Sequence, residues 1–288
     1  MTNTNGRTLR EAYVQASSFL AAAGVDEAQT SARRLLALQL GIPDAELLWR
    51  FPEPFPPEAE ARWQELLQRR AAGEPLQYIV GEQEFYGLPF AVSPAVLIPR
   101  PETELLVEAI VRHGQRMWPP GGAEPVASAD RTAAAVQCPG WEVAAVDLSP
   151  EALAVAQANA EQNGAAERIR WLQGDLLLPV IESGLAPDIL VSNPPYIPSA
   201  DIPGLQREVR QHEPLLALDG GSDGLTPYRR MAEQLAQLPA WPRLVGFEVG
   251  QGQADEVAEL MRATGRFEWI EIVPDYAGIP RHVLAGRG

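Results

Sequence analysis

Apolar residues in the first quarter of the chain recur at the three- and four-residue spacing of amphipathic helices. The pattern predicts helices within residues 8–24, 26–41 and 56–73, each of which ends in a glycine. Glycine suits a helix C-terminus because it adopts left-handed backbone angles without steric cost. Asp26 is the predicted N-cap of the second helix. We therefore expect a small helical domain over residues 1–75.

The pattern changes between residues 76 and 95, where aromatic and β-branched residues stand among glycines at turn positions. These residues are Tyr78, Val80, Phe85, Phe90 and Val92. Such residues on either side of a glycine-containing turn are typical of a β-hairpin. We expect residues 76–95 to form a hairpin that links the helical domain to the rest of the chain.

Residues 96–288 alternate between short apolar runs and helical segments. The runs that predict strands are residues 143–147, 168–175, 188–193, 243–250, 269–273 and 282–286. After the first run, Ser149 and Pro150 mark the start of a well-capped helix. This alternation predicts an α/β fold with a mostly parallel sheet that helices cover on both faces. Ligands of such sheets bind at the carboxyl ends of the strands.

Two acidic residues follow successive predicted strands. Asp147 ends the first strand and Asp175 ends the second. A carboxylate in this place can accept hydrogen bonds from both hydroxyls of a ribose. Taken alone, each residue is about equally well explained as an acid that begins a turn. Because both would lie at one edge of the sheet, together they favour a nucleoside-containing ligand, with Asp175 near its base.

The third predicted strand ends in the segment Asn193-Pro194-Pro195-Tyr196. Each proline fixes its own φ at about −65° and restrains the preceding residue to an extended backbone. The Asn193 side chain and the Pro194 carbonyl are therefore held where they can accept hydrogen bonds. With Tyr196 as a flat wall, these acceptors fit a planar amino group, such as that of an amide or of adenine. The alternative is a proline-stiffened loop that only packs Tyr196 into the core.

Composition narrows the classes of function. The formal net charge of −15 argues against binding a nucleic-acid backbone by bulk electrostatics. The single cysteine, Cys138, excludes an internal disulfide and a cysteine metal cage, and the three histidines are too scattered to favour a metal site. The N-terminal residues do not read as a secretory signal, and no apolar run approaches the length of a membrane span. We therefore expect a cytoplasmic protein.

An NPPY segment after a strand, with an acidic residue after an earlier strand, resembles the S-adenosylmethionine-dependent methyltransferases that methylate planar amino groups. Three further segments narrow the resemblance to the release-factor glutamine methyltransferases, the HemK/PrmC family: VLIPRPETELLVEA (96–109), ALDGGSDGLTPYRR (217–230) and YAGIPRHVLAGR (276–287). The helical N-terminal region and the YIVGEQEFYGLPFAV segment are similar too, so the resemblance covers nearly the whole chain. It implies a Rossmann-like methyltransferase sheet in residues 96–288.

The resemblance also implies a reaction. A methyl group passes from S-adenosylmethionine to the side-chain amide nitrogen of the glutamine in the Gly-Gly-Gln loop of peptide chain release factors. By this resemblance Asn193 and the Pro194 carbonyl accept hydrogen bonds from the amide, Pro195 belongs to the same catalytic loop, and Tyr196 walls the glutamine. The helical domain helps to recognise the release factor, and the protein is expected to act as a monomer.

Four positions are implied for the cofactor. Asp147 would hold the ribose, Asp175 and Leu176 would lie by the adenine, and Asn193 would touch the cofactor as well as the substrate. No metal ion is expected in the site.

One segment departs from the family pattern. A glycine-rich loop of the form G-x-G-x-G, preceded by an apolar strand, is expected about 20 residues before Asp147. Residues 118–137 contain only the pair Gly121-Gly122, and no apolar strand stands before it. The sequence AEPVASAD (123–130) is poorly suited to form the first strand of the sheet. It also lacks the glycines that would let the backbone approach the cofactor closely. We therefore expect weakened affinity for S-adenosylmethionine. A compensated reading-frame slip, a degenerate cofactor loop and a different local structure are three open explanations.

Two alternatives to the glutamine methyltransferase stay open from the residues. NPPY-type loops also serve base amino-methyltransferases of DNA or RNA, which would need a basic face that the net charge of −15 disfavours. The other is a catalytically impaired homologue that binds release factors without transferring a methyl group.

Overall fold

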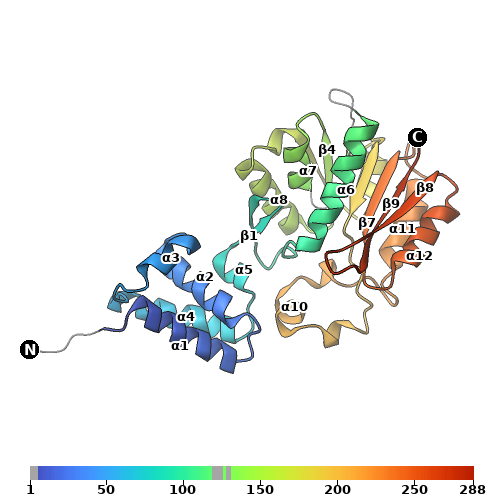
Figure 1. Cartoon of the computed structure of the whole chain (residues 1–288). Coiled ribbons are helices and arrows are strands. Elements are labelled where there is room, and N and C mark those ends of the chain that lie inside the picture. The colour runs from blue at the N-terminus through green and yellow to red at the C-terminus, as the bar shows by residue number, and fades with distance from the viewer. Residues whose placement is uncertain (1–5, 119–125, 128–130) are drawn as a thin grey trace, which may run out of the picture. The chain divides into compact units, whose positions relative to one another are not determined.

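The computed structural model describes residues 6–118, 126–127 and 131–288. The chain divides into two compact units (Figure 1). The first comprises Met1–Glu82 and Gln206–His212, and the second comprises Gln83–Leu205 and Glu213–Gly288. The helical unit therefore extends beyond residue 75, where the sequence placed its end, and includes a short segment from the second half of the chain.

The first unit is built from helices. They are α1 (Leu9–Ala22), α2 (Ala28–Leu40), α3 (Asp44–Arg50), α4 (Glu60–Ala71), α5 (Leu76–Val80) and α10 (Arg207–His212), with a 3₁₀ turn at Pro57–Ala59. The apolar faces of α1 to α5 meet in a core that includes the fully buried Trp63. The Arg70 guanidinium of α4 forms an ion pair with Glu208 of α10 at 2.7 Å, which ties the two chain segments of this unit together. The helices predicted within residues 8–24, 26–41 and 56–73 are confirmed as α1, α2 and α4.

Three details of this unit differ from the prediction. Asp26 does not cap α2, because the N-cap position falls on Glu27 and no side chain caps it. Helix α3 was not predicted. Residues 76–80 form α5 and not a strand, because Leu76 and Ile79 pack into the helical core and Gly81 ends the helix in the left-handed conformation.

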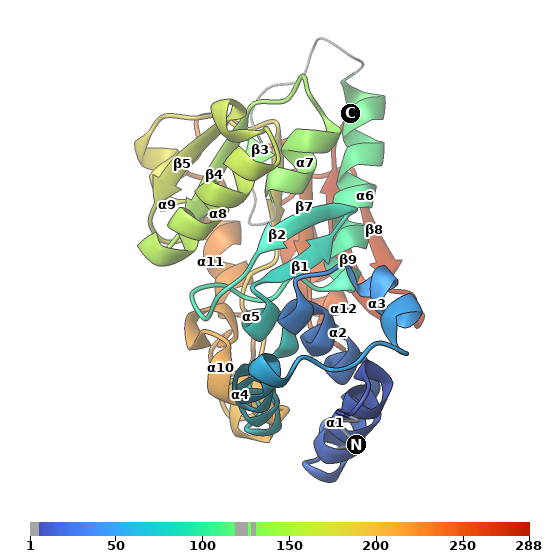
Figure 2. The ribbon, with the colours of Figure 1, turned by 90° about the vertical axis from the view of Figure 1, so that its left-hand side faces the viewer.

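The hairpin is shorter than predicted. Its strands are β1 (Glu82–Phe85) and β2 (Leu88–Ala91), joined by a turn in which Tyr86 and Gly87 have φ of 53° and 73°. Glu104 stabilises this turn by accepting a hydrogen bond from the Tyr86 N–H at 2.8 Å. Figure 2 shows β2 beside α8 (Pro150–Gln162), where the buried Asn159 side chain bonds both backbone polar groups of Ala91.

The second unit contains a mixed sheet. In the described residues its strands are β3 (Val126–Ala127), β4 (Val143–Asp147), β5 (Ile169–Gln173), β6 (Ile189–Ser192), β7 (Leu244–Glu248), β8 (Trp269–Pro274) and β9 (Pro280–Gly286). Their spatial order is β5-β4-β3-β6-β7-β9-β8, and β9 runs antiparallel to both neighbours. The six predicted strands are confirmed within one or two residues of their ends.

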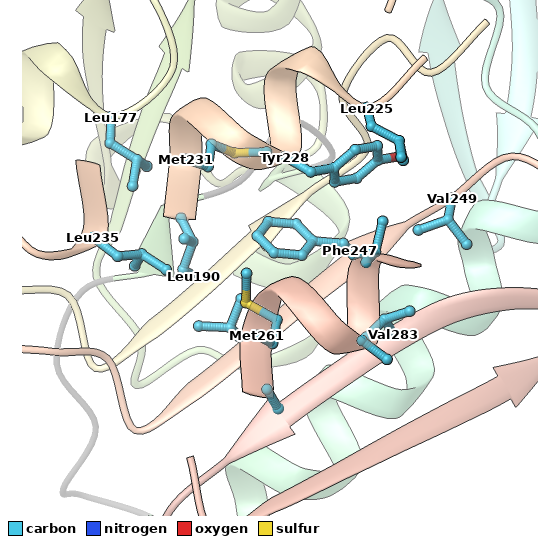
Figure 3. Close-up of a cluster of buried hydrophobic side chains, with 14 of the residues drawn as sticks. Leu177, Leu190, Leu225, Tyr228, Met231, Leu235, Phe247, Val249, Met261 and Val283 are labelled. Atoms are coloured by element: carbon cyan, nitrogen blue, oxygen red, sulfur yellow. The ribbon is translucent and has the colours of Figure 1, made fainter. Parts of the chain in front are cut away.

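Helices cover both faces of this sheet. On one face lie α6 (Pro101–Met117), α7 (Arg131–Gln137) and α8, and on the other lie α9 (Leu178–Glu182), α11 (Thr226–Leu235) and α12 (Ala254–Ala263). Short 3₁₀ turns occupy Ala166–Arg168, Ile202–Gly204 and Leu215–Ala217. Figure 3 shows the second face, where Phe247 of β7 packs edge-on against Tyr228 of α11 with ring centroids 5.7 Å apart.

No helix in the described ranges is both long and apolar enough to cross a membrane.

Strand β3 corrects the expectation that AEPVASAD could not supply the first position of the sheet. Val126 pairs with Val143 on one side and with Ile189 on the other, so these two residues fill the centre of the sheet. Two residues suffice because their neighbours β4 and β6 are both parallel to β3 and offer hydrogen-bonding groups on each side. Of the segment where a glycine-rich loop was sought, residues 119–125, which include Gly121-Gly122, and residues 128–130 lie outside the described residues.

Candidate active site

A cavity of about 500 Å³ opens in the second unit at the carboxyl ends of β4, β5 and β6. This volume is in the range of sites for drug-sized ligands. Strand β3 has β4 on one side and β6 on the other, so the chain leaves the sheet in opposite directions from this point. Open α/β sheets bind ligands at such a switch point. The predicted positions Asp147, Asp175, Leu176, Asn193, Pro194 and Pro195 all line this one cavity.

Asp147 lies half-buried at the end of β4. Its Oδ1 accepts a hydrogen bond from the Ser149 N–H at 2.9 Å, which fixes the carboxylate at the start of α8. Within the described part of the chain, no hydrogen bond to Oδ2 is found. One oxygen thus orients the side chain while the other stays available to accept hydrogen bonds from hydroxyl groups.

Asp175 lies at the end of β5 and is held by Arg230 of α11. Arg230 donates to both carboxylate oxygens, with 3.3 Å between Nη1 and Oδ1. The next residue, Leu176, has a φ of 51°, which is unusual for a residue with a side chain. Sequence reasoning missed Arg230, although it stands in the ALDGGSDGLTPYRR segment that carries the family resemblance.

Asn193 lies at the end of β6 and lines the cavity together with Pro194 and Pro195. Its Nδ2 donates to Oγ1 of Thr103, the third residue of α6, at 3.2 Å. Among the described residues, no donor bonds the Asn193 Oδ1 or the Pro194 carbonyl. Two acceptors on neighbouring residues that line the cavity thus have no protein donor among the described residues, and two acceptors are what a planar amino group needs. Sequence reasoning missed Thr103 as well, although it stands in the VLIPRPETELLVEA segment that carries the family resemblance.

Tyr196 differs from its three neighbours because it is not among the described residues that line the cavity. Its ring packs against the core cluster around Phe247, and its hydroxyl points to Glu248 at 3.5 Å. Burial raises the pKa of Tyr196 to about 12, so the phenol keeps its proton at neutral pH. Its role as a wall for the substrate stays a prediction.

The NPPY loop is braced from behind by the DGGSDG segment. Ile197, which follows Tyr196, donates its N–H to the carbonyl of Leu218, just before this segment, at 3.0 Å and accepts from the Gly220 N–H at 2.9 Å. Gln253 donates to the Tyr196 carbonyl at 2.9 Å. The glycines matter because a Cβ at Gly220 would lie 2.8 Å from the Pro195 carbonyl oxygen. These contacts explain why ALDGGSDGLTPYRR accompanies NPPY.

This strand order, with a cavity edged by Asp147, Asp175 and Asn193, defines the class of the protein: an S-adenosylmethionine-dependent methyltransferase with an α/β fold. Solved structures share the fold. The catalytic domain of hMettl16, solved with MAT2A 3′UTR hairpin 1, superposes with a TM-score of 0.53 and 16% identity over 81% of each chain. The same domain with hairpin 6 gives a TM-score of 0.51, 15% identity, and coverage of 76% of this chain and 81% of that chain.

The family follows from sequence comparison. The PrmC N-terminal domain model matches residues 11–81, and an RMKL-like methyltransferase domain model matches residues 104–207. A release factor glutamine methyltransferase of Moorella thermoacetica is 43% identical over 97% of this chain and 99% of its own. The protein of that name from Geobacter sulfurreducens is 41% identical over 97% of this chain and 96% of its own. The one from Bacillus subtilis is 37% identical over 97% of this chain and 98% of its own. The chain belongs to the release factor glutamine methyltransferase family.

Proposed function

We propose that this protein transfers a methyl group from S-adenosylmethionine to the side-chain amide nitrogen of the glutamine in the Gly-Gly-Gln loop of peptide chain release factors. One observation carries the proposal: Asn193 and Pro194, whose acceptor oxygens have no donor among the described residues, line the same cavity as Asp147 and Asp175. The names of the relatives favour a release factor over a nucleic-acid base as the substrate.

The residues present fit S-adenosylmethionine. The free oxygen of Asp147 suits the ribose hydroxyls, and Asp175 with Leu176 lies at the next strand end, where the base of such a nucleoside would be expected. When bound, the cofactor supplies an electrophilic methyl group on a sulfonium. Transfer would break the S–CH₃ bond as the N–CH₃ bond forms, would leave S-adenosylhomocysteine, and would pass one amide proton to solvent, so no redox partner is required.

Positioning carries much of the catalysis. An amide nitrogen is a weak nucleophile because its lone pair is delocalised into the carbonyl. Acceptors on both amide N–H groups would hold the nitrogen toward the methyl group, and correct orientation of this kind removes a large part of a barrier. Asn193 Oδ1 and the Pro194 carbonyl are the acceptors in this proposal, and Tyr196 supports them from the core.

The remaining partners follow from the same proposal. The helical unit would contact the release factor, and a protein substrate suits the net charge of −15 better than a bare nucleic acid does. The reaction would take place in the cytoplasm, where translation terminates, with the protein acting as a monomer.

The experiment incubates the purified chain with methyl-labelled S-adenosylmethionine and either a release factor or DNA. Label on the release factor, lost when its Gly-Gly-Gln glutamine is replaced, supports the proposal. Label on DNA supports the base methyltransferase, and release-factor binding without label supports the impaired homologue. The Asn193→Ala variant is expected to lose transfer, and unchanged turnover would contradict the assignment of the site.

A further inference from the structure

A chain of buried polar side chains runs beneath the candidate site. Thr103 of α6 is 2% exposed and Glu248, the last residue of β7, is 1% exposed. The Thr103 hydroxyl donates to Glu248 Oε2 at 2.6 Å, and Asn193 Nδ2 donates to the same hydroxyl oxygen at 3.2 Å. A buried carboxylate is costly unless its neighbours supply donors, so this arrangement calls for a reason.

The number of protons that these side chains can donate fixes the direction of each hydrogen bond among them. A carboxylate can only accept hydrogen bonds, and a hydroxyl has one proton to give. Because Thr103 gives that proton to Glu248, its oxygen can only accept from Asn193. The amide must therefore turn its NH₂ toward Thr103, and its Oδ1 is left for the cavity. The orientation follows from the donors and acceptors themselves.

Further side chains lie around Glu248. The Tyr196 hydroxyl approaches Oε1 at 3.5 Å, and the Tyr228 hydroxyl donates to the Glu248 backbone carbonyl at 2.6 Å. His282 Nε2 lies 4.0 Å from Oε2, and burial lowers the pKa of this histidine to about 4, so the ring is neutral at pH 7. Arg281 also acts on this cluster, because its charge lowers the pKa of Tyr196 against the larger effect of burial.

We propose that Thr103 and Glu248 are positioning residues that hold the Asn193 amide with its Oδ1 toward the amino group of the substrate. The inference rests on the proposed function for the identity of that amino group. With the amide rotated by half a turn, Asn193 would present donors to a substrate that also presents donors. The hydrogen bonds from Asn193 to Thr103 and from Thr103 to Glu248, which we call the relay, thus exclude the flipped amide. The flipped amide would fill the same space but could not bind the substrate.

The first test compares Thr103→Val with Thr103→Ser. Valine keeps the shape of threonine but cannot bond Asn193 or Glu248, whereas serine keeps the hydroxyl. We expect Thr103→Val to lower kcat about 10- to 100-fold and Thr103→Ser to restore most of kcat. Glu248→Gln can also donate to Thr103, so it is expected to lower kcat too. Equal kcat in Thr103→Val, Glu248→Gln and wild type would overturn the proposal.

A second readout does not depend on methyl transfer. The Asn193 side-chain NH₂ signals in a ¹⁵N spectrum are assigned by their loss in Asn193→Ala. We expect Thr103→Val to shift these signals and speed their hydrogen exchange, and Thr103→Ser to leave them near their wild-type positions. If wild type transfers no methyl group, the proposed function fails while this measurement still tests the relay. Unshifted Asn193 signals in Thr103→Val would show that the relay does not orient the amide.

Discussion

Gly224 lies against Tyr196 so closely that a Cβ at position 224 would be 2.2 Å from the Tyr196 carbonyl oxygen. Gly224 also has a φ of 76°, which disfavours any side chain. The loop that carries Gly224 therefore depends on the absence of a side chain to reach the back of the NPPY segment.

We expect Gly224→Ala to displace the NPPY segment and to reduce methyl transfer to the release factor by at least about tenfold. The matched control is Gly265→Ala, because Gly265 has a similar φ of 65° but no atom of the described residues within 4 Å of its Cβ position. Both variants should lose about 1–2 kcal/mol of unfolding free energy from backbone strain. Only Gly224→Ala should also lose methyl-transfer activity, as measured by initial rates on folded protein. Equal activity of the two variants would contradict the role assigned to the close contact.

Arg230 is expected to matter for the cofactor and not for the release factor. Replacing Arg230 by Gln removes both donors that orient Asp175 at the edge of the cavity. We expect several-fold weaker binding of S-adenosylhomocysteine by calorimetric titration, with little change in KM for the release factor. Arg262→Gln is the control, since its exposed ion pair with Glu259 lies on α12. If Arg230→Gln and Arg262→Gln bind S-adenosylhomocysteine equally well, the assignment of Asp175 to the cofactor site is wrong.

His282 should make the protein less stable in acid. Burial lowers the pKa of His282 to about 4, against the opposing effect of backbone carbonyls at Glu102 and Val273, while the unfolded chain has the ordinary value of about 6.5. Between these values the unfolded state binds more protons than the folded state. The free energy of unfolding must therefore fall as the pH is lowered from 6.5 to 4, by at most about 3 kcal/mol from this residue.

Urea denaturation across this pH range measures the effect. The His282→Asn variant should lose less stability than wild type between pH 6.5 and 4, because asparagine does not titrate. His113→Gln is the control on α6, where His113 lies 3.1 Å from Glu271 and stacks on Trp269. Parallel stability curves for wild type and His282→Asn would show that His282 is not the group responsible.

Much of the fold could be predicted because its signals are local. Ser149 caps α8 by accepting from the Ala152 N–H at 3.1 Å, and each long apolar run became a strand. Prediction failed where tertiary packing decided the outcome. Residues 76–80 contain strand-like Tyr78 and Val80 but became a helix that packs Leu76 and Ile79 into the helical core. Local propensity is a weak guide where packing overrides it.

The residues of the candidate site that follow strands could be predicted from the sequence, but the residues that hydrogen-bond to them could not. Asp147, Asp175 and Asn193 each follow an apolar run, and parallel strands bring such positions to one edge. Thr103 bonds Asn193 across 90 residues of sequence, and Arg230 reaches Asp175 across 55. No local pattern encodes these pairs, because they depend on which face of α6 and α11 meets the sheet.

The last prediction concerns affinity for S-adenosylmethionine. Strand β3 supplies the central sheet position, but the pair Gly121-Gly122 is the only glycine signal in residues 118–137. We therefore still expect weakened affinity for S-adenosylmethionine, because glycines in the expected G-x-G-x-G pattern let a backbone approach a ligand closely. Calorimetric titration of the wild-type chain with S-adenosylmethionine tests this expectation. Asp147→Ala serves as a further reference and should weaken binding by removing the ribose acceptor. Ordinary micromolar affinity for the wild-type chain would show that the cofactor is held without such a loop.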